Sequence, residues 1–138
     1  MIQFHYETDF LLQEEALLQS AIERCVQARG FSVGALNYIF CDDPYLHNLN
    51  TTYLDHDTYT DIITFDYRTG EVLSADIFIS VERVTENAIK FSQTTENELY
   101  RVVFHGVLHC MGYTDKTPEE QDIMRKEEEK CLALLTTI

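Results

Sequence analysis

The sequence predicts a single α+β domain over residues 1–138, in which a mixed sheet of about four strands packs with several helices. Three observations lead to this fold class. β-rich runs alternate with helical periodicity along the chain. Hydrophobic residues make up 45% of the 138 residues, which is enough for one core, and only five glycines and two prolines argue against disorder. No internal repeat, linker or low-complexity tract divides the chain.

The first half of the chain predicts two strands that alternate with two helices. Residues 2–6 form a short β-rich run, and residues 32–41 form a longer one with many aromatic and aliphatic side chains. Between them, an apolar-periodic stretch over 10–29 predicts a helix that Gly30 ends as a C-terminal cap. After the second strand, Pro44 suits the first turn of a second helix.

The second half predicts a β-hairpin followed by three helices. Two β-rich runs, 61–67 and 71–81, are joined by a short connection in which Gly70 supplies a positive φ. Helices are then predicted from residue 82, over 95–111 with a capping box at Thr95–Glu98, and from 117 onward. In the last of these helices, the run Glu127-Glu128-Glu129 is interpreted as a solvated face.

Charge and hydropathy restrict the partners of the protein. Ten Lys and Arg against 24 Asp and Glu give a net charge of −14. A negative surface repels phosphate backbones, so a nucleic-acid role needs a local basic groove, a bound cation or a protein adaptor. No apolar run approaches the ~20 residues that span a bilayer, and the start MIQFHYETDF lacks the regions of a signal peptide. We therefore expect a soluble, cytoplasmic protein with no membrane partner.

The spacing of the cysteines excludes two kinds of site. Cys25, Cys41, Cys110 and Cys131 lie far apart with no CxxC pair, so neither a zinc ribbon nor a redox motif is available. We expect free, mostly buried thiols.

The segment 102–115 carries the strongest indication of chemistry. His105 and His109 lie four residues apart, which places both imidazoles on one face of a helix, close enough to share a metal ion. A left-handed turn at Gly112 would bring Asp115 back toward that face as a third ligand and leave a fourth position open, as in catalytic sites. Two histidines at this spacing are also common as surface or satisfied core residues, so the pair alone leaves both interpretations open.

Other sequence features narrow the class of enzyme. Gly106 follows the first histidine where an HExxH metallopeptidase has its glutamate, so a zinc peptidase is not expected. Gly106 instead leaves room for substrate or for a neighbouring strand. The chain contains neither GxxxxGK[ST] nor GxGxxG, which excludes phosphate-loop and dinucleotide sites of those types.

The segment HGVLHCMGYTD, together with Leu49-Asn50, Tyr53, the stretch 57–65 and Asp76-Ile77, resembles the YbeY family of bacterial endoribonucleases. The resemblance implies a zincin-like α+β fold, one Zn²⁺ per chain, and single-strand-specific cleavage of ribosomal RNA precursors. It implies a role in 16S rRNA 3′-end maturation and ribosome quality control. Implied partners are ribosomal RNA, small-subunit ribosomal proteins and an assembly GTPase, with no role on DNA.

Two departures from the family pattern affect the expected site. Asp115 stands where the family usually has a third histidine, and this harder ligand makes Mn²⁺, Fe²⁺ or Ni²⁺ more credible beside zinc. Leu54 stands where the family has an arginine taken as functional, so the phosphate contact expected there is absent. His56, Arg101 and Lys116 are candidates to replace it, although each is also interpretable as an ordinary surface charge.

The sequence predicts substrate contacts but assigns no catalytic base. We expect RNA to lie in a narrow groove near the metal, contacted by the cations Arg83, Lys90, Arg101 and Lys116. Two alternatives to the endoribonuclease stay open: a ribosome-assembly binding module whose metal is largely structural, and a metal-dependent hydrolase of another substrate.

Overall fold

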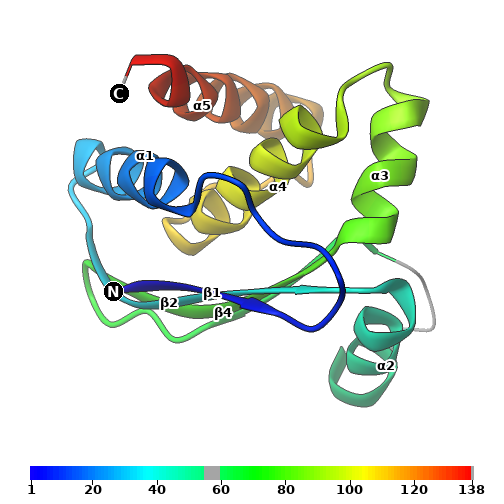
Figure 1. The fold of residues 1–138 in the computed structure, drawn as a ribbon. Helices are drawn as coiled ribbons and strands as arrows, with labels where there is room; N and C mark the ends of the chain where they lie inside the picture. The colour runs from blue at the N-terminus through cyan, green and yellow to red at the C-terminus, as the bar shows by residue number, and fades with distance from the viewer. Residues whose placement is uncertain (55–59, 138) are drawn as a thin grey trace.

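A computed structural model describes residues 1–54 and 60–137 and confirms the predicted α+β class (Figure 1). Its elements, in chain order, are β1 (Ile2–Tyr6), α1 (Glu15–Ala28), β2 (Ser32–Cys41), α2 (Asp43–Leu54), β3 (Ile62–Asp66), β4 (Val72–Ser80), α3 (Val81–Lys90), α4 (Thr95–Cys110) and α5 (Pro118–Thr137). The predicted candidate His56 lies outside the described residues.

The four strands form one mixed sheet in the order β1-β2-β4-β3. β1, β2 and β4 run parallel, and β3 pairs antiparallel with β4 at the edge. The predicted hairpin is therefore present, and Gly70 in its connection has a φ of +59°. In register, Tyr38 of β2 and Thr64 of β3 both lie beside Ile77 of β4.

The helices cover the two faces of the sheet unequally. Figure 1 shows α1, α4 and α5 on one side of the sheet, α2 on the other, and α3 at one end. Side chains that alternate along β2 and β4, such as Tyr38 and Ile77, enter the main core under α4. α2 covers a smaller apolar cluster around Leu46 and Ile63 on the opposite face.

α4 is the central helix of the main core. Its buried side chains include Val102, Val103, Phe104, Val107 and Leu108. Gly106 faces the sheet, and a Cβ there would lie 2.9 Å from Ile62 Cδ1 and 3.2 Å from Ile77 Cγ2. The helix therefore approaches β3 and β4 closely, and a larger residue at this position would require the Ile62 and Ile77 side chains to shift.

Two helix starts differ from the sequence predictions. α1 begins at Glu15 rather than near residue 10, because Phe10 packs as part of the loop, with its ring centroid 5.5 Å from that of Phe40. α4 is capped by Thr94, whose hydroxyl accepts from the Asn97 N–H, so the capping box predicted at Thr95 and Glu98 is wrong. The packing of Phe10 sets the start of α1, and the choice of the Thr94 hydroxyl over that of Thr95 as the cap sets the start of α4.

Several other predicted features of the fold agree with the structure. Gly30, with a φ of +82°, follows the end of α1 as predicted. At the start of α5, the Thr117 hydroxyl accepts from the Glu120 N–H and Glu120 accepts from the Thr117 N–H. All four cysteines are free and buried, and the sulfurs of Cys25 and Cys131 lie 2.6 Å apart between α1 and α5. Over the ranges 1–54 and 60–137, the helices are too short or too polar to cross a bilayer.

One buried hydrogen bond joins the sheet to α4. The Tyr38 side chain is fully buried, and its hydroxyl donates to the Val103 carbonyl over 3.1 Å. We predict that Tyr38→Phe lowers the free energy of unfolding by about 1 kcal/mol, because the hydroxyl is lost while the packing of the ring is kept. Urea denaturation measures this change. Tyr100→Phe is the control, since no hydrogen bond of its hydroxyl is found among the described residues, and equal losses in both variants would contradict the prediction.

Candidate metal centre

Two histidines of α4 converge above the helix. His105 and His109 lie one turn apart, and their Nε2 atoms are 2.9 Å from each other. Both side chains are only partly exposed, at 18% and 33%. Helical spacing alone therefore brings two imidazole nitrogens to one point, as predicted.

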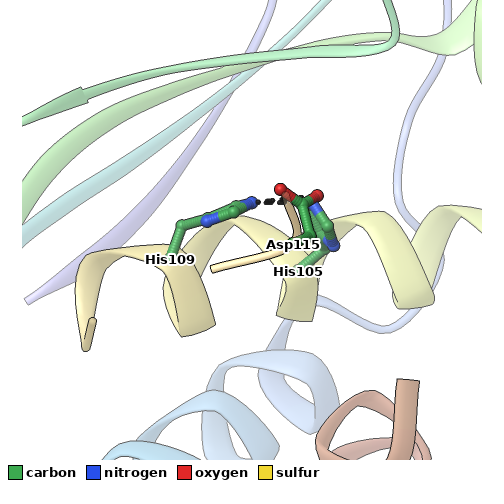
Figure 2. Close-up of side chains that lie close together, drawn as sticks. All are labelled: His105, His109 and Asp115. Carbon is green, nitrogen blue, oxygen red and sulfur yellow. Dashed lines mark hydrogen bonds and ion pairs between the residues drawn. The ribbon is translucent and has the colours of Figure 1, made fainter. Parts of the chain in front are cut away.

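The chain reversal after α4 brings a carboxylate to the same point. Gly112 has a φ of +102°, its N–H donates to the His109 carbonyl, and the Tyr113 N–H donates to the Leu108 carbonyl, which together form a Schellman motif. Beyond this turn, Asp115 Oδ2 lies 3.4 Å from His105 Nε2 and 3.5 Å from His109 Nε2. Figure 2 shows the two imidazoles and the carboxylate pointing toward one another.

The outer nitrogens of both histidines have acceptors. His105 Nδ1 lies 2.6 Å from Glu128 Oε2, and His109 Nδ1 lies 2.9 Å from the Tyr113 carbonyl. A carboxylate and a carbonyl both accept, so the neutral tautomer that satisfies both of them carries the proton on each Nδ1 and presents a lone pair on each Nε2. Such outer hydrogen bonds orient metal-ligating histidines in proteins.

In this tautomer, the inner atoms form a set of three acceptors without a donor. One ring nitrogen each of His105 and His109 and one carboxylate oxygen of Asp115 all lie within 4.8 Å of one another. Three acceptors at this separation repel one another unless a cation lies between them. The residues present therefore fit a divalent ion with nitrogen and oxygen ligands.

The glutamate that contacts His105 belongs to a network of charged side chains. Arg101 Nη2 lies 2.7 Å from Glu98 Oε2, and Arg101 Nη1 lies 3.1 Å from Glu128 Oε1. Both glutamate side chains are only 2% exposed. Burial raises the pKa of Glu128, but the hydrogen bond from His105 and the charge of Arg101 outweigh this effect, so the pKa lies below its usual value. The hydrogen bond to Glu98 raises the pKa of Arg101, and Glu128 adds to this effect against the burial of the guanidinium.

Glu127 supports the second histidine indirectly. Its Oε1 accepts from the Tyr113 hydroxyl over 3.0 Å and from Arg29 Nη2 over 2.8 Å. Tyr113 in turn supplies the carbonyl that accepts from His109. The interpretation of residues 127–129 as a solvated face is therefore wrong for Glu127 and Glu128, and among these three only Glu129 is exposed.

Two hollows flank the ligands. One of about 340 Å³ lies toward β3 and is lined by Ile62, Thr64, Asp66, His105, His109 and Cys110. The other, of about 230 Å³, lies toward α5 and is lined by Arg101, His105, Asp115, Gln121, Met124, Arg125 and Glu128. The three ligand residues thus have open space on both sides.

The predicted substrate cations lie in different surroundings. Arg101 lines the hollow toward α5 and is paired there with Glu98 and Glu128. Lys116 is exposed and directly follows Asp115. On α3, Arg83 pairs with Asp43 and with Glu86, each at 2.8 Å, and Lys90 Nζ lies 5.7 Å from the centre of the Phe91 ring. Leu54, at the end of α2, is 42% exposed. Contact of the four cations with RNA stays a prediction.

Sequence reasoning missed two acidic residues and one cation near the ligands. Glu128 was detectable in principle, because Met124, Glu128 and Cys131 share the helical spacing of a buried face. Asp61 precedes β3, where burial raises its pKa, while the charge of Arg101 and a backbone hydrogen bond lower it by less. Arg125 had no local signal, since only the packing of α5 on α4 brings it to the site.

The fold and the three converging side chains define an α+β protein with a candidate site for a divalent metal ion. A family model described as endoribonuclease YbeY matches residues 3–136. The chain is 48% identical over 133 residues to the endoribonuclease YbeY of Christiangramia forsetii, covering 96% of this chain and 93% of that protein. It is 47% identical over 134 residues to that of Flavobacterium johnsoniae, covering 97% and 96%.

A solved structure agrees with these relatives. The solution structure of TM1509 from Thermotoga maritima superposes with a TM-score of 0.70 at 29% sequence identity, covering 98% of this chain and 89% of that one. The chain belongs to the endoribonuclease YbeY family.

The Glu128 network gives a prediction for metal binding. We predict that Glu128→Gln weakens zinc binding by about 10- to 100-fold, because His105 loses the carboxylate that orients its ring. The metal-free variant should also lose about 2–3 kcal/mol of unfolding free energy, because Arg101 loses one of its two buried partners. Competition with a chromophoric chelator measures the zinc affinity, and urea denaturation in EDTA measures the stability. Glu129→Gln, the same substitution at the exposed neighbour, is the control, and equal effects of the two would contradict the role of Glu128.

Proposed function

We propose that this protein is a zinc-dependent, single-strand-specific endoribonuclease that acts on ribosomal RNA precursors. The observation that carries the proposal is the set of three acceptors formed by His105, His109 and Asp115, in a chain of the YbeY family. By the same resemblance we propose 16S rRNA 3′-end maturation and ribosome quality control in the cytoplasm as its role. Small-subunit ribosomal proteins and an assembly GTPase are its proposed partners.

Zinc is the proposed metal because of the ligand set. Two imidazole nitrogens and one carboxylate oxygen are common zinc ligands, and three protein ligands leave a position for water or substrate. When bound, a divalent ion supplies Lewis-acid polarisation of a phosphodiester oxygen and of water. Mn²⁺, Fe²⁺ and Ni²⁺ are the alternatives that the carboxylate makes credible.

The chain itself holds the reacting groups in place. Glu128 and the Tyr113 carbonyl keep the protons on Nδ1 of His105 and His109, so that both Nε2 atoms stay available as ligands. The hollows toward β3 and α5 give a single strand space on either side of the ligands. We propose that Arg101 and Lys116, together with Arg83 and Lys90 of α3, contact the RNA and offset part of its negative charge.

One observation favours a second candidate, a ribosome-assembly binding module with a structural metal. Leu54 presents an exposed apolar side chain where the family has an arginine. Under this alternative, chelation would unfold the protein and no RNA would be cleaved.

Metal content tests the ligand set. We predict about one equivalent of metal in the purified protein and none in Asp115→Ala, because two neutral imidazoles hold a divalent ion weakly without the carboxylate. Elemental analysis measures the content. Asp122→Ala removes an exposed acid of α5 and should keep the full equivalent. A full equivalent in Asp115→Ala would reject Asp115 as a ligand.

Cleavage of RNA tests the activity. We predict that the parent cuts a single-stranded model RNA and spares the matching duplex, and that His109→Ala reduces the rate by at least about 100-fold because the metal is lost. Gel analysis of the products measures cleavage, and circular dichroism checks that the variant is folded. Intact RNA with the metal-loaded parent would reject the endoribonuclease and favour the binding module.

A further inference from the structure

A third hollow continues from the metal centre toward the end of α3. Its volume is about 420 Å³, and it shares Arg101, Arg125 and Glu128 with the smaller hollow that contains His105 and Asp115. The two spaces therefore adjoin along α5. An RNA strand with one phosphate at His105 and Asp115 has room for a neighbouring nucleotide in this hollow.

The walls of this hollow combine an aromatic ring with two carboxamides. Phe91, at the end of α3, is 54% exposed, and Leu132 of α5 adds a partly buried apolar side chain. Asn97 Nδ2 donates to Gln93 Oε1 over 2.7 Å. Among the described residues this pairing leaves a donor on Gln93 and an acceptor on Asn97 for a ligand. An exposed ring beside one donor and one acceptor suits a nucleobase, which stacks by its face and hydrogen-bonds by its edge.

The charges of the hollow suit a base rather than a phosphate. The buried Glu98 and Glu128 and the exposed Glu129 outnumber the two guanidinium groups. Arg101 is already held by Glu98 and Glu128, whereas no ion pair or hydrogen bond of Arg125 is found within residues 1–54 and 60–137. Arg125 lies where the two hollows meet, so its guanidinium is available to a phosphate there.

We propose that this hollow is a nucleotide subsite, in which a base of single-stranded RNA stacks on Phe91 and hydrogen-bonds to Gln93 and Asn97. Arg125 binds the phosphate between this base and the metal centre. The subsite rests on the proposed endoribonuclease function and names the contacts of its substrate. It also assigns a phosphate-binding role to an arginine of α5 that makes no ion pair within residues 1–54 and 60–137.

A fluorescent reporter tests occupation of the hollow directly. The chain contains no tryptophan, so Phe91→Trp introduces a single indole into the proposed subsite. We expect a 2′-O-methyl RNA hexamer to quench this fluorescence by stacking, and Arg125→Gln in the same background to weaken binding by about 10-fold. Lys126→Gln removes an equal charge from the exposed neighbour on α5 and should leave binding unchanged. Tyr45→Trp, on α2 across the sheet, should show no quenching.

Cleavage kinetics separate the subsite from the proposed function. Phe91→Leu and Arg125→Gln should each raise the KM for single-stranded RNA by about 10-fold at unchanged metal content. Ile89→Ala, which shortens a 76% exposed side chain of α3, is the control. Absence of quenching in Phe91→Trp, or parental KM values in both variants, would overturn the subsite while leaving the endoribonuclease intact. Absence of cleavage by the parent would instead overturn the proposed function.

Discussion

The geometry of the candidate metal centre depends on the contact between α5 and α4. Glu128 forms a hydrogen bond with His105 directly. Glu127 accepts a hydrogen bond from the Tyr113 hydroxyl, and the Tyr113 carbonyl forms a hydrogen bond with His109. Two successive residues of one helix therefore orient both imidazoles of another. The arrangement requires Glu128 to be buried as an anion, which is costly in isolation, and Arg101 offsets that cost by lying between Glu128 and Glu98.

This dependence explains which parts of the site the sequence could predict. His105, His109, Gly112 and Asp115 lie within eleven residues, so helix periodicity and one left-handed turn place them without knowledge of the tertiary fold. Glu128 lies on another helix, and the triple-glutamate run around it has the composition of a solvated face. The packing of α5 on α4 turns Glu128 inward, and although its spacing from Met124 and Cys131 indicates a buried face, the composition of the run does not.

The same distinction applies to the fold. The strands and the hairpin followed from β-rich runs and from a glycine with positive φ, and their boundaries agreed within one or two residues. The start of α1 was predicted too early because Phe10 is apolar for a reason other than helix formation: its ring packs on Phe40 from a loop. An apolar side chain in the sequence indicates that the residue is buried. Whether it is buried from a helix or from a loop depends on the residues against which it packs.

The close contact at Gly106 distinguishes this candidate site from the HExxH sites of zinc peptidases. In the HExxH arrangement a glutamate occupies this place beside the first histidine, but here even a Cβ would press on Ile62 and Ile77. A carboxylate at residue 106 would be buried between two isoleucines with its charge unmatched. The glutamate of a zinc peptidase would therefore require the Ile62 and Ile77 side chains to be repacked or replaced before the helix could accommodate it beside His105.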